Sequence, residues 1–264
     1  MRGMPVMRRR SAAQRLAIGV AVLVTLAFIG AGAVSAASGI VVQSKNVTRT
    51  FVGMVSTVHV TVDGSIQVQP GPAGQVTVAT HKVWSFQQPT VSETQSGTDI
   101  TVNASCPGLQ LGGSCSTSVR LTVPSAIALD LTSQNANVSV SGVQGALVLH
   151  SGDGDVDVAS ASGPLHLSSD NGNVTGSGLT SPEARASSND GDVGLTFTAA
   201  PTTVTASSDN GNARVGVPHG PTAYLVSAST DNGNRSVGVR TDSASDRRIV
   251  VDSSNGDVSV FYAS

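Results

Sequence analysis

The chain has 264 residues, of which 39% are hydrophobic, 12% charged and 3% aromatic, and its formal net charge is −2. Lysine and glutamate occur only at Lys45, Lys82, Glu93 and Glu183, whereas valine, serine, threonine and glycine are frequent. Helix formers are scarce and β-branched residues common, which argues against an α-helical or α/β domain. The valine content and low net charge argue against a disordered chain.

Positive charge is concentrated at the N-terminus. Residues 1–37 hold five arginines and no acid, so the remainder carries 10 basic and 17 acidic groups, a net charge of −7. Phosphate contacts need clustered cations, so we expect no nucleic-acid partner for this acidic body.

The N-terminus has the pattern of an export segment. A basic stub, residues 1–15, precedes 22 uncharged residues at 16–37, which are long enough to cross a bilayer as a helix. Because the flanking arginines all precede this segment, we predict a single-pass membrane protein with a cytoplasmic N-terminus and an extracytoplasmic body. The alternative is a signal peptide cleaved near the small residues at 31–33 or 35–37, which would leave a secreted protein.

After a predicted linker at 38–54, residues 55–126 read as an irregular β region. Alternating apolar positions predict strands at 55–62, 65–69, 75–83, 98–104 and 118–123. Cys106 and Cys115 bracket a Pro/Gly-rich loop, and outside the membrane a disulfide between them is the expected state. A zinc site is the alternative, but no histidine is near and the spacing fits no zinc pattern.

Residues 127–264 contain a repeat. A cassette of the type S-x-N/D-G-N/D-V recurs seven times, with central positions spaced by 18, 18, 19, 20, 22 and 23 residues. The central residue is Ala136 in the first copy and glycine in the others: Gly154, Gly172, Gly191, Gly211, Gly233 and Gly256. Apolar residues alternate on both sides of the centre and change parity across it, so each cassette predicts two strands joined by a turn.

Two all-β architectures fit this repeat. In a single-stranded β-solenoid of 18–23-residue coils, preceded by one N-terminal transmembrane helix, each cassette is a corner. In an antiparallel meander or sandwich each cassette is a hairpin turn. The solenoid is favoured because aspartates immediately flanking the glycine never follow one another in successive copies: Asp153 has Asn135 before it and Asn171 after it. Asp209 and Asp231, one position further out, would be adjacent and break this rule.

The glycines are predicted structural turn residues. If the coils stack in sequence order, Gly172 and Gly191 lie inside the stack and Gly256 lies in its terminal coil, so Gly256→Val would only fray one end. If the corner also needs a positive φ, Gly172→Val costs on the order of 1–3 kcal/mol.

In combination, the export segment, the valine-rich strands such as TVHVTVDGSIQVQ, the cysteine pair, the proline-bounded strand RLTVPSAIALDL and the cassettes resemble a known family. This is the bacterial putative-adhesin family, a β-solenoid domain of unknown function on membrane-anchored or exported proteins. The resemblance covers roughly residues 50–262. It implies a right-handed β-helix-like fold and an envelope location, and it supplies no catalytic residues.

Motifs for catalysis or cofactor binding are missing from the sequence. Asp153, Asp155 and Asp157 resemble the start of a calcium loop, but Val158 and Pro164 replace the glycine and glutamate that such a loop requires. We therefore read these aspartates as turn residues, with calcium as a weak alternative, and expect no cofactor.

These observations favour a non-catalytic, adhesin-like surface or scaffold protein of the cell envelope, with a glycan or another envelope protein as its partner. One alternative is an extracytoplasmic sensing or regulatory module. A second is a carbohydrate-active enzyme, although most acids lie in turns beside glycine instead of forming the carboxylate pair that such chemistry needs.

Overall fold

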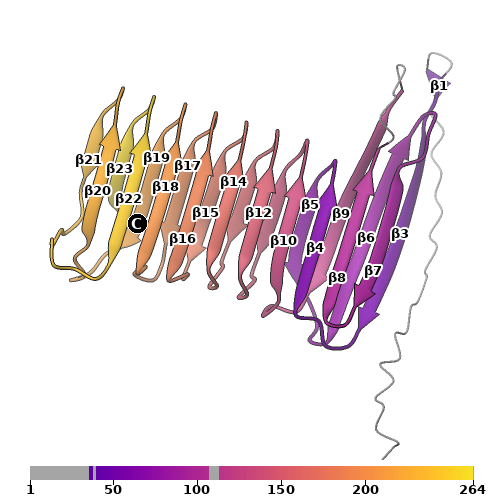
Figure 1. Ribbon diagram of the computed structural model, residues 1–264, viewed down its shortest axis with the longest axis horizontal. Helices are drawn as coiled ribbons and strands as arrows, with labels where there is room; N and C mark the ends of the chain where they lie inside the picture. Colours follow the sequence, from indigo (N-terminus) through magenta and orange to yellow (C-terminus); the bar gives the residue numbers. More distant parts are fainter. Residues whose placement is uncertain (1–35, 38–39, 107–112, 264) are drawn as a thin grey trace, which may run out of the picture.

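The structure is a computed structural model that describes residues 36–37, 40–106 and 113–263. It is an elongated two-sheet β-solenoid (Figure 1), and strands are its only regular secondary structure in those residues. No helix there is long and apolar enough to cross a membrane. The predicted stub 1–15 and membrane segment 16–37 lie outside the described residues, except that Ala36 and Ala37 form the short strand β1.

The two main sheets have ten and eleven strands, and β1 (Ala36–Ala37) pairs separately with β2 (Ile40–Val41). The ten-stranded sheet contains β4 (Thr57–Val62), β7 (Thr90–Ser96), β8 (Asp99–Ser105), β10 (Ala128–Ser133), β12 (Leu147–Ser151), β14 (Leu165–Ser169), β16 (Glu183–Ser188), β18 (Thr203–Ser208), β20 (Leu225–Thr230) and β22 (Arg248–Ser253). The eleven-stranded sheet contains β3 (Gln43–Val52), β5 (Ile66–Pro70), β6 (Gln75–Trp84), β9 (Cys115–Val123), β11 (Val138–Ser141), β13 (Val156–Ala159), β15 (Val174–Leu179), β17 (Val193–Phe197), β19 (Ala213–Pro218), β21 (Arg235–Val237) and β23 (Val258–Ala263).

Each repeat forms one coil, with one strand in each sheet and the glycine cassette at the corner between them. Equivalent residues of neighbouring coils pair in parallel, as Leu131 does with Leu149 and Leu149 with Leu167. This confirms the solenoid. The alternative of an antiparallel meander is wrong, because the cassettes turn the chain from one sheet to the other and leave no hairpin between neighbours.

The core lies between the sheets and is built from the inward-facing residues of both. In most coils a Leu or Val column of one sheet packs on a Val column of the other. Where the ten-stranded sheet has only Ala184 and Ala186, the facing strand β17 provides the larger Leu195 and Phe197. Large residues on one sheet thus compensate for small residues on the other, which keeps the core filled.

The coils do not follow sequence order at either end of the stack. The C-terminal coil, β22–β23, lies between β18–β19 and β20–β21, so the last coil in the chain is second to last in space. At the other end β4–β5 lies between β8–β9 and β10–β11. The expectation that Gly256 occupies the terminal coil is therefore wrong, and Gly233 occupies it instead.

The N-terminal end of the stack is closed by antiparallel strands. β6 pairs with β9, β3 pairs with β6, and β7 pairs with β8. Residues 43–52 fall within the predicted linker 38–54 but form β3, so this part of the segment is an edge strand of the eleven-stranded sheet. Its β-branched and aromatic residues Val47, Thr48, Thr50, Phe51 and Val52 give it the β-propensity that the linker prediction overlooked.

Candidate functional site

An open groove of about 680 Å³ lies on the outer face of the eleven-stranded sheet. It crosses β3, β6, β9 and β5, and two rows of paired residues run across it. One row joins Asn46, His81 and Ser118, and the other joins Thr48, Ala79, Arg120 and Gln67. Because successive strand residues point to opposite faces, both rows project outward.

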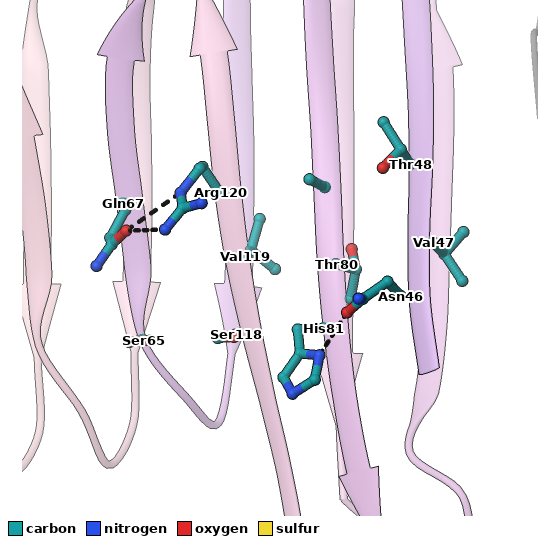
Figure 2. Close-up of a pocket in the computed structure, with 11 residues that line it drawn as sticks. Asn46, Val47, Thr48, Ser65, Gln67, Thr80, His81, Ser118, Val119 and Arg120 are labelled. Carbon is teal, nitrogen blue, oxygen red and sulfur yellow. Dashed lines mark hydrogen bonds between the residues drawn. The ribbon is translucent and has the colours of Figure 1, made fainter. Parts of the chain in front are cut away.

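The lining of the groove combines small residues, such as Ser65 and Ser118, with larger polar side chains (Figure 2). Arg120 donates from Nε and Nη2 to Gln67 Oε1 at 3.3 and 2.9 Å, and His81 Nδ1 is hydrogen-bonded to Asn46 Oδ1. These bonds hold the guanidinium, amide and imidazole groups in place above the sheet. No carboxylate lines the groove, so its walls are neutral or cationic.

A smaller groove of about 300 Å³ lies on the outer face of the ten-stranded sheet. Its lining includes the exposed Val148 together with His166, Glu183 and Arg185. His166 and Arg185 are paired residues on neighbouring strands β14 and β16. This face therefore carries both charge signs, unlike the first groove.

The repeat corners are held by glycines stacked one above another. A Cβ on Gly172 would lie 2.2 Å from the carbonyl oxygen of Gly154, and one on Gly191 would lie 2.2 Å from that of Gly172. The same relation links Gly211 to Gly191, Gly256 to Gly211 and Gly233 to Gly256. None of these glycines has a positive φ. The positive-φ hypothesis is therefore wrong, and glycine is required because neighbouring backbones approach too closely for a side chain.

A serine hydroxyl ties the corner of most repeat coils to the neighbouring coil, and Thr230 takes its place in the terminal coil. Ser169 Oγ accepts the N–H of Gly172 in its own coil at 2.9 Å and donates to the carbonyl of Gly154 in the neighbouring coil at 2.8 Å. Ser151 and Ser188 make the same two bonds. These serines are buried, and their hydroxyls satisfy backbone groups that would otherwise be orphaned.

The residues after each glycine form a hydrogen-bonded ladder in which Asn and Asp alternate. The backbone N–H of each coil donates to the side-chain oxygen of the coil before it, as Asn173 does to Asp155 at 2.8 Å. In spatial order the ladder is Asn137, Asp155, Asn173, Asp192, Asn212, Asp257 and Asn234. The alternation is complete only because the C-terminal coil is inserted. The same insertion puts Ser254 between Asp209 and Asp231, so the expected contact between these aspartates does not occur.

Two of the three candidate calcium ligands, Asp153 and Asp155, accept hydrogen bonds from the neighbouring coil. Asp153 Oδ1 accepts from Asn171 Nδ2 at 2.7 Å, and Asp155 belongs to the ladder. Asp157 projects from the exposed face of β13, where desolvation by neighbouring groups, followed by the negative charge of Asp155, raises its pKa. In the described part of the chain, no group of three or more His, Cys, Asp or Glu side chains is arranged to hold a metal ion.

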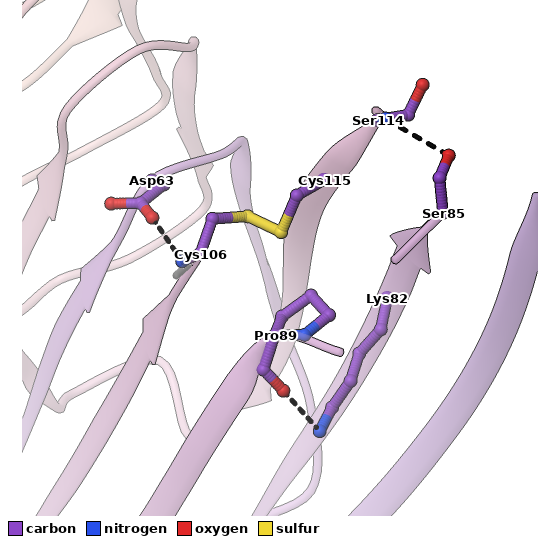
Figure 3. The surroundings of a disulfide bond; sticks show 7 residues. All are labelled: Asp63, Lys82, Ser85, Pro89, Cys106, Ser114 and Cys115. Atoms are coloured by element: carbon purple, nitrogen blue, oxygen red, sulfur yellow. Dashed lines mark hydrogen bonds between the residues drawn. A yellow bond between two sulfur atoms is a disulfide. The ribbon is translucent and has the colours of Figure 1, made fainter. Parts of the chain in front are cut away.

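Cys106 and Cys115 form a disulfide (Figure 3). Cys106 follows β8 and Cys115 begins β9, so the bond links the two sheets at the corner of the β8–β9 coil. The Asp63 carboxylate accepts the N–H of Cys106 at 2.6 Å. The disulfide therefore occupies the corner where other coils have the stacked glycine cassette.

Two carboxyl groups have a raised pKa, but they do not face each other. Burial is the main cause for Glu93, whose side chain lies between the sheets on β7, whereas Asp157 projects from β13 in the other sheet. The described residues thus show no pair of carboxylates across either groove, which is the arrangement that glycosidase chemistry uses.

Sequence reasoning did not find the groove residues Asn46, Gln67, His81 and Arg120. Alternation within the predicted strands places Gln67, His81 and Arg120 on a polar face, and this signal was available. No signal in the sequence indicated that these residues lie close together, because their proximity depends on the antiparallel pairing of β6 with β9 and of β3 with β6.

The Toastrack DUF4097 family model matches residues 56–261, which is most of the chain. The chain belongs to this family. The match confirms the resemblance to the putative-adhesin family and includes both the irregular coils and the regular ones. No curated protein matches this Toastrack chain.

Solved structures similar to this Toastrack protein come from several bacteria. A putative adhesin from Bacteroides fragilis is 14% identical, with a TM-score of 0.49 over 83% of this chain and 97% of that one. A putative adhesin from Parabacteroides merdae is 14% identical, with a TM-score of 0.42 over 83% and 95% of the chains. A putative cell adhesion protein from Clostridium sporogenes is 9% identical, with a TM-score of 0.37 over 83% and 100%.

Proposed function

We propose that this protein is a non-catalytic, adhesin-like component of the bacterial cell envelope that binds a glycan in the groove on the eleven-stranded sheet. The groove carries the proposal. Its guanidinium, imidazole, amide and hydroxyl groups are of the kinds that hydrogen-bond to sugar hydroxyls, and Arg120 is fixed in position by Gln67. The hydrogen-bonded strands β3, β6, β9 and β5 provide a rigid platform for such a surface.

The proposed location is outside the cytoplasmic membrane. It is supported by the arginines before residues 16–37, by the 22 uncharged residues of that segment and by the disulfide, which persists in oxidising compartments. We propose that the segment is retained as a single-pass anchor, with the solenoid outside. Membrane fractionation tests this, and a soluble species beginning near Val34 or Ser38 would contradict it.

A glycan array with the full chain, followed by affinity measurement on the best ligand, tests the groove. We expect Arg120→Ala to weaken that affinity about tenfold, because a charge-assisted hydrogen bond is lost. Arg214→Ala is the matched control. Arg214 is an exposed residue of the same sheet, on β19 and outside the groove.

Two results would contradict the proposal. The first is the absence of any glycan ligand, or an equal effect of Arg120→Ala and Arg214→Ala. The second is release of sugar products from the bound glycan in a parallel turnover assay, which would support the carbohydrate-active alternative.

A further inference from the structure

A cluster of charged side chains lies between the sheets at the N-terminal end of the solenoid, on the opposite face of β3 and β6 from the glycan groove. Arg49, Lys82 and Glu93 come from β3, β6 and β7, which close this end. With Val47 and Val91 they line an open pocket of about 190 Å³. Because β3 residues alternate, Arg49 and Val47 face this pocket while Asn46 and Thr48 face the groove on the other side of the sheet.

The two cations of this pocket are tied to carbonyl oxygens instead of pairing closely with the carboxylate. Arg49 Nη1 donates to the backbone carbonyl of Glu93 at 2.6 Å, while its distance to Glu93 Oε2 is 3.9 Å. Lys82 Nζ donates to the carbonyl of Pro89 at 3.4 Å (Figure 3). The carboxylate of Glu93 instead accepts from Thr80 Oγ1 at 3.2 Å. These bonds fix the positions of the cations without neutralising them by close contact.

The pocket also has a hydrogen-bond donor without an acceptor. Arg49 Nε is buried and has no hydrogen-bond partner. A buried donor in this state is costly, and buried polar groups in native proteins are nearly always satisfied. Arg49 and Lys82 together outnumber the single carboxylate Glu93 in the lining of this pocket, so an added anion would bring the missing negative charge.

The electrostatics of Lys82 agree with this picture. Burial lowers the pKa of its ammonium group, and the nearby positive charge of Lys45 lowers it further, while Glu93 opposes the shift only in part. The ammonium group is therefore in surroundings that do not fully stabilise its charge, and an anion bound beside it would do so.

We propose that this pocket binds an oxyanion of phosphate size, held by the guanidinium of Arg49 and the ammonium of Lys82. A planar guanidinium and a lysine ammonium are the usual protein ligands of phosphate groups. The same chemistry suits a free phosphate or the phosphodiester of a lipid headgroup. The site is distinct from the glycan groove, because Arg49 and Lys82 do not line that groove, although Val47 lines both.

The test is a calorimetric titration of the full chain in detergent with two soluble probes. Inorganic phosphate represents the free anion, and glycerophosphoglycerol represents a headgroup without its acyl chains. We expect at least one probe to bind the wild type, and Arg49→Gln and Lys82→Gln each to weaken that binding about tenfold. The tighter probe identifies the source of the phosphate.

Arg214→Gln, which removes an arginine from the exposed face of β19, is the control and should leave the affinity unchanged. Arg49→Gln could destabilise the fold because Glu93 stays buried, so Arg49→Gln with Glu93→Gln is titrated as well and should also bind weakly. Absence of binding to the wild type, or equal affinity in the wild type and both single variants, would overturn the proposal. Glycan affinity should be unchanged in Lys82→Gln, which separates this site from the groove.

Discussion

The interior coils of the solenoid and the coils at its two ends follow different rules. In the interior, each coil stacks on the one before it in the chain, from β10–β11 to β18–β19. At each end the outermost coil and its neighbour are exchanged relative to chain order, with β22–β23 inserted at one end and β4–β5 at the other. Chain connectivity therefore does not by itself decide which coils touch.

The difference shows that side-chain complementarity contributes to stacking order. In spatial order Asp257 lies between Asn212 and Asn234, whereas chain order would put those two asparagines side by side and Asp257 at the end. Alternation keeps carboxylates apart and gives each one a hydrogen-bond donor. At the exposed end, Arg235 stands at the position that valine or alanine occupies in other coils, which discourages a further strand from stacking there.

The largest effect is expected from deleting residues 245–264, which removes β22 and β23. β20 pairs only with β22 and β21 only with β23, so the coil at 221–244 would lose its partners in both sheets. We expect amide hydrogens of residues 225–237 to lose all protection from exchange, as measured by hydrogen exchange with mass spectrometry.

The matched control deletes residues 221–244 instead. It removes only the terminal coil and leaves five residues between β19 and β22, the same number as the 198–202 connection between β17 and β18. This variant should keep β22–β23 protected and lose only one coil interface. The inserted order would be wrong if the coil that remains at the C-terminal end were as well protected after deletion of residues 245–264 as after deletion of residues 221–244.

The next effect separates Gly256 from Gly233. Gly256→Ala places a Cβ 2.2 Å from the carbonyl oxygen of Gly211 in a coil with neighbours on both sides, so we expect a loss of about 2–3 kcal/mol in unfolding free energy. Gly233→Ala has a similar clash with Gly256, but the terminal coil can move away, and the cost should be about 1 kcal/mol.

Denaturant unfolding measures both values, with Gly194→Ala as the control, because a Cβ there meets nothing within 4 Å. The opposite ranking, with Gly233→Ala the more destabilising change, would indicate that the coils stack in chain order, with β22–β23 at the end.

A smaller effect is expected in the ladder. Asn212→Asp would place three carboxylates in succession, at 192, 212 and 257, and remove the bond from Asn212 Nδ2 to Asp192. Like charges at adjacent sheet positions cost roughly 0.2–1 kcal/mol, and salt screens them. The melting temperature should therefore fall in dilute buffer and partly recover at high salt.

Asp155→Asn is the control for this ladder variant, since asparagine already occupies both neighbouring positions, and it should be neutral or slightly stabilising. A chelator should change neither melting temperature. A chelator-dependent melting temperature in the wild type would instead support the calcium alternative for Asp153, Asp155 and Asp157.

The smallest effect concerns Asp157 and pH. Because its pKa is raised in the folded state, the stability it contributes is present in full below its unfolded pKa of about 3.9 and is lost as pH rises through the folded value. Asp157→Asn should therefore raise the melting temperature slightly near pH 7 and leave it unchanged near pH 3. A stabilisation that is the same at both pH values would contradict this account of the carboxyl group.

The repeat, its two strands per coil and its corners could all be predicted from the amino-acid sequence. Alternating apolar residues around each glycine, together with Asn and Asp beside it, specify these features locally, and residues such as Leu149 and Val156 are buried as their parity predicts. The pairing of Cys106 with Cys115 was likewise readable from loop length and composition.

The order of neighbouring coils and the place of the groove depend on long-range strand pairing, which the local sequence pattern does not specify. Parallel coils of similar sequence can stack in more than one order with the same local pattern, so the insertion of β22–β23 depends on contacts between residues far apart in the chain. Arg120 lies beside Gln67 for the same reason: β9 pairs with β5, from 53 residues earlier. The reason glycine is needed at the corner also comes from such a contact, since it is the backbone of the neighbouring coil, not the local φ, that excludes a side chain.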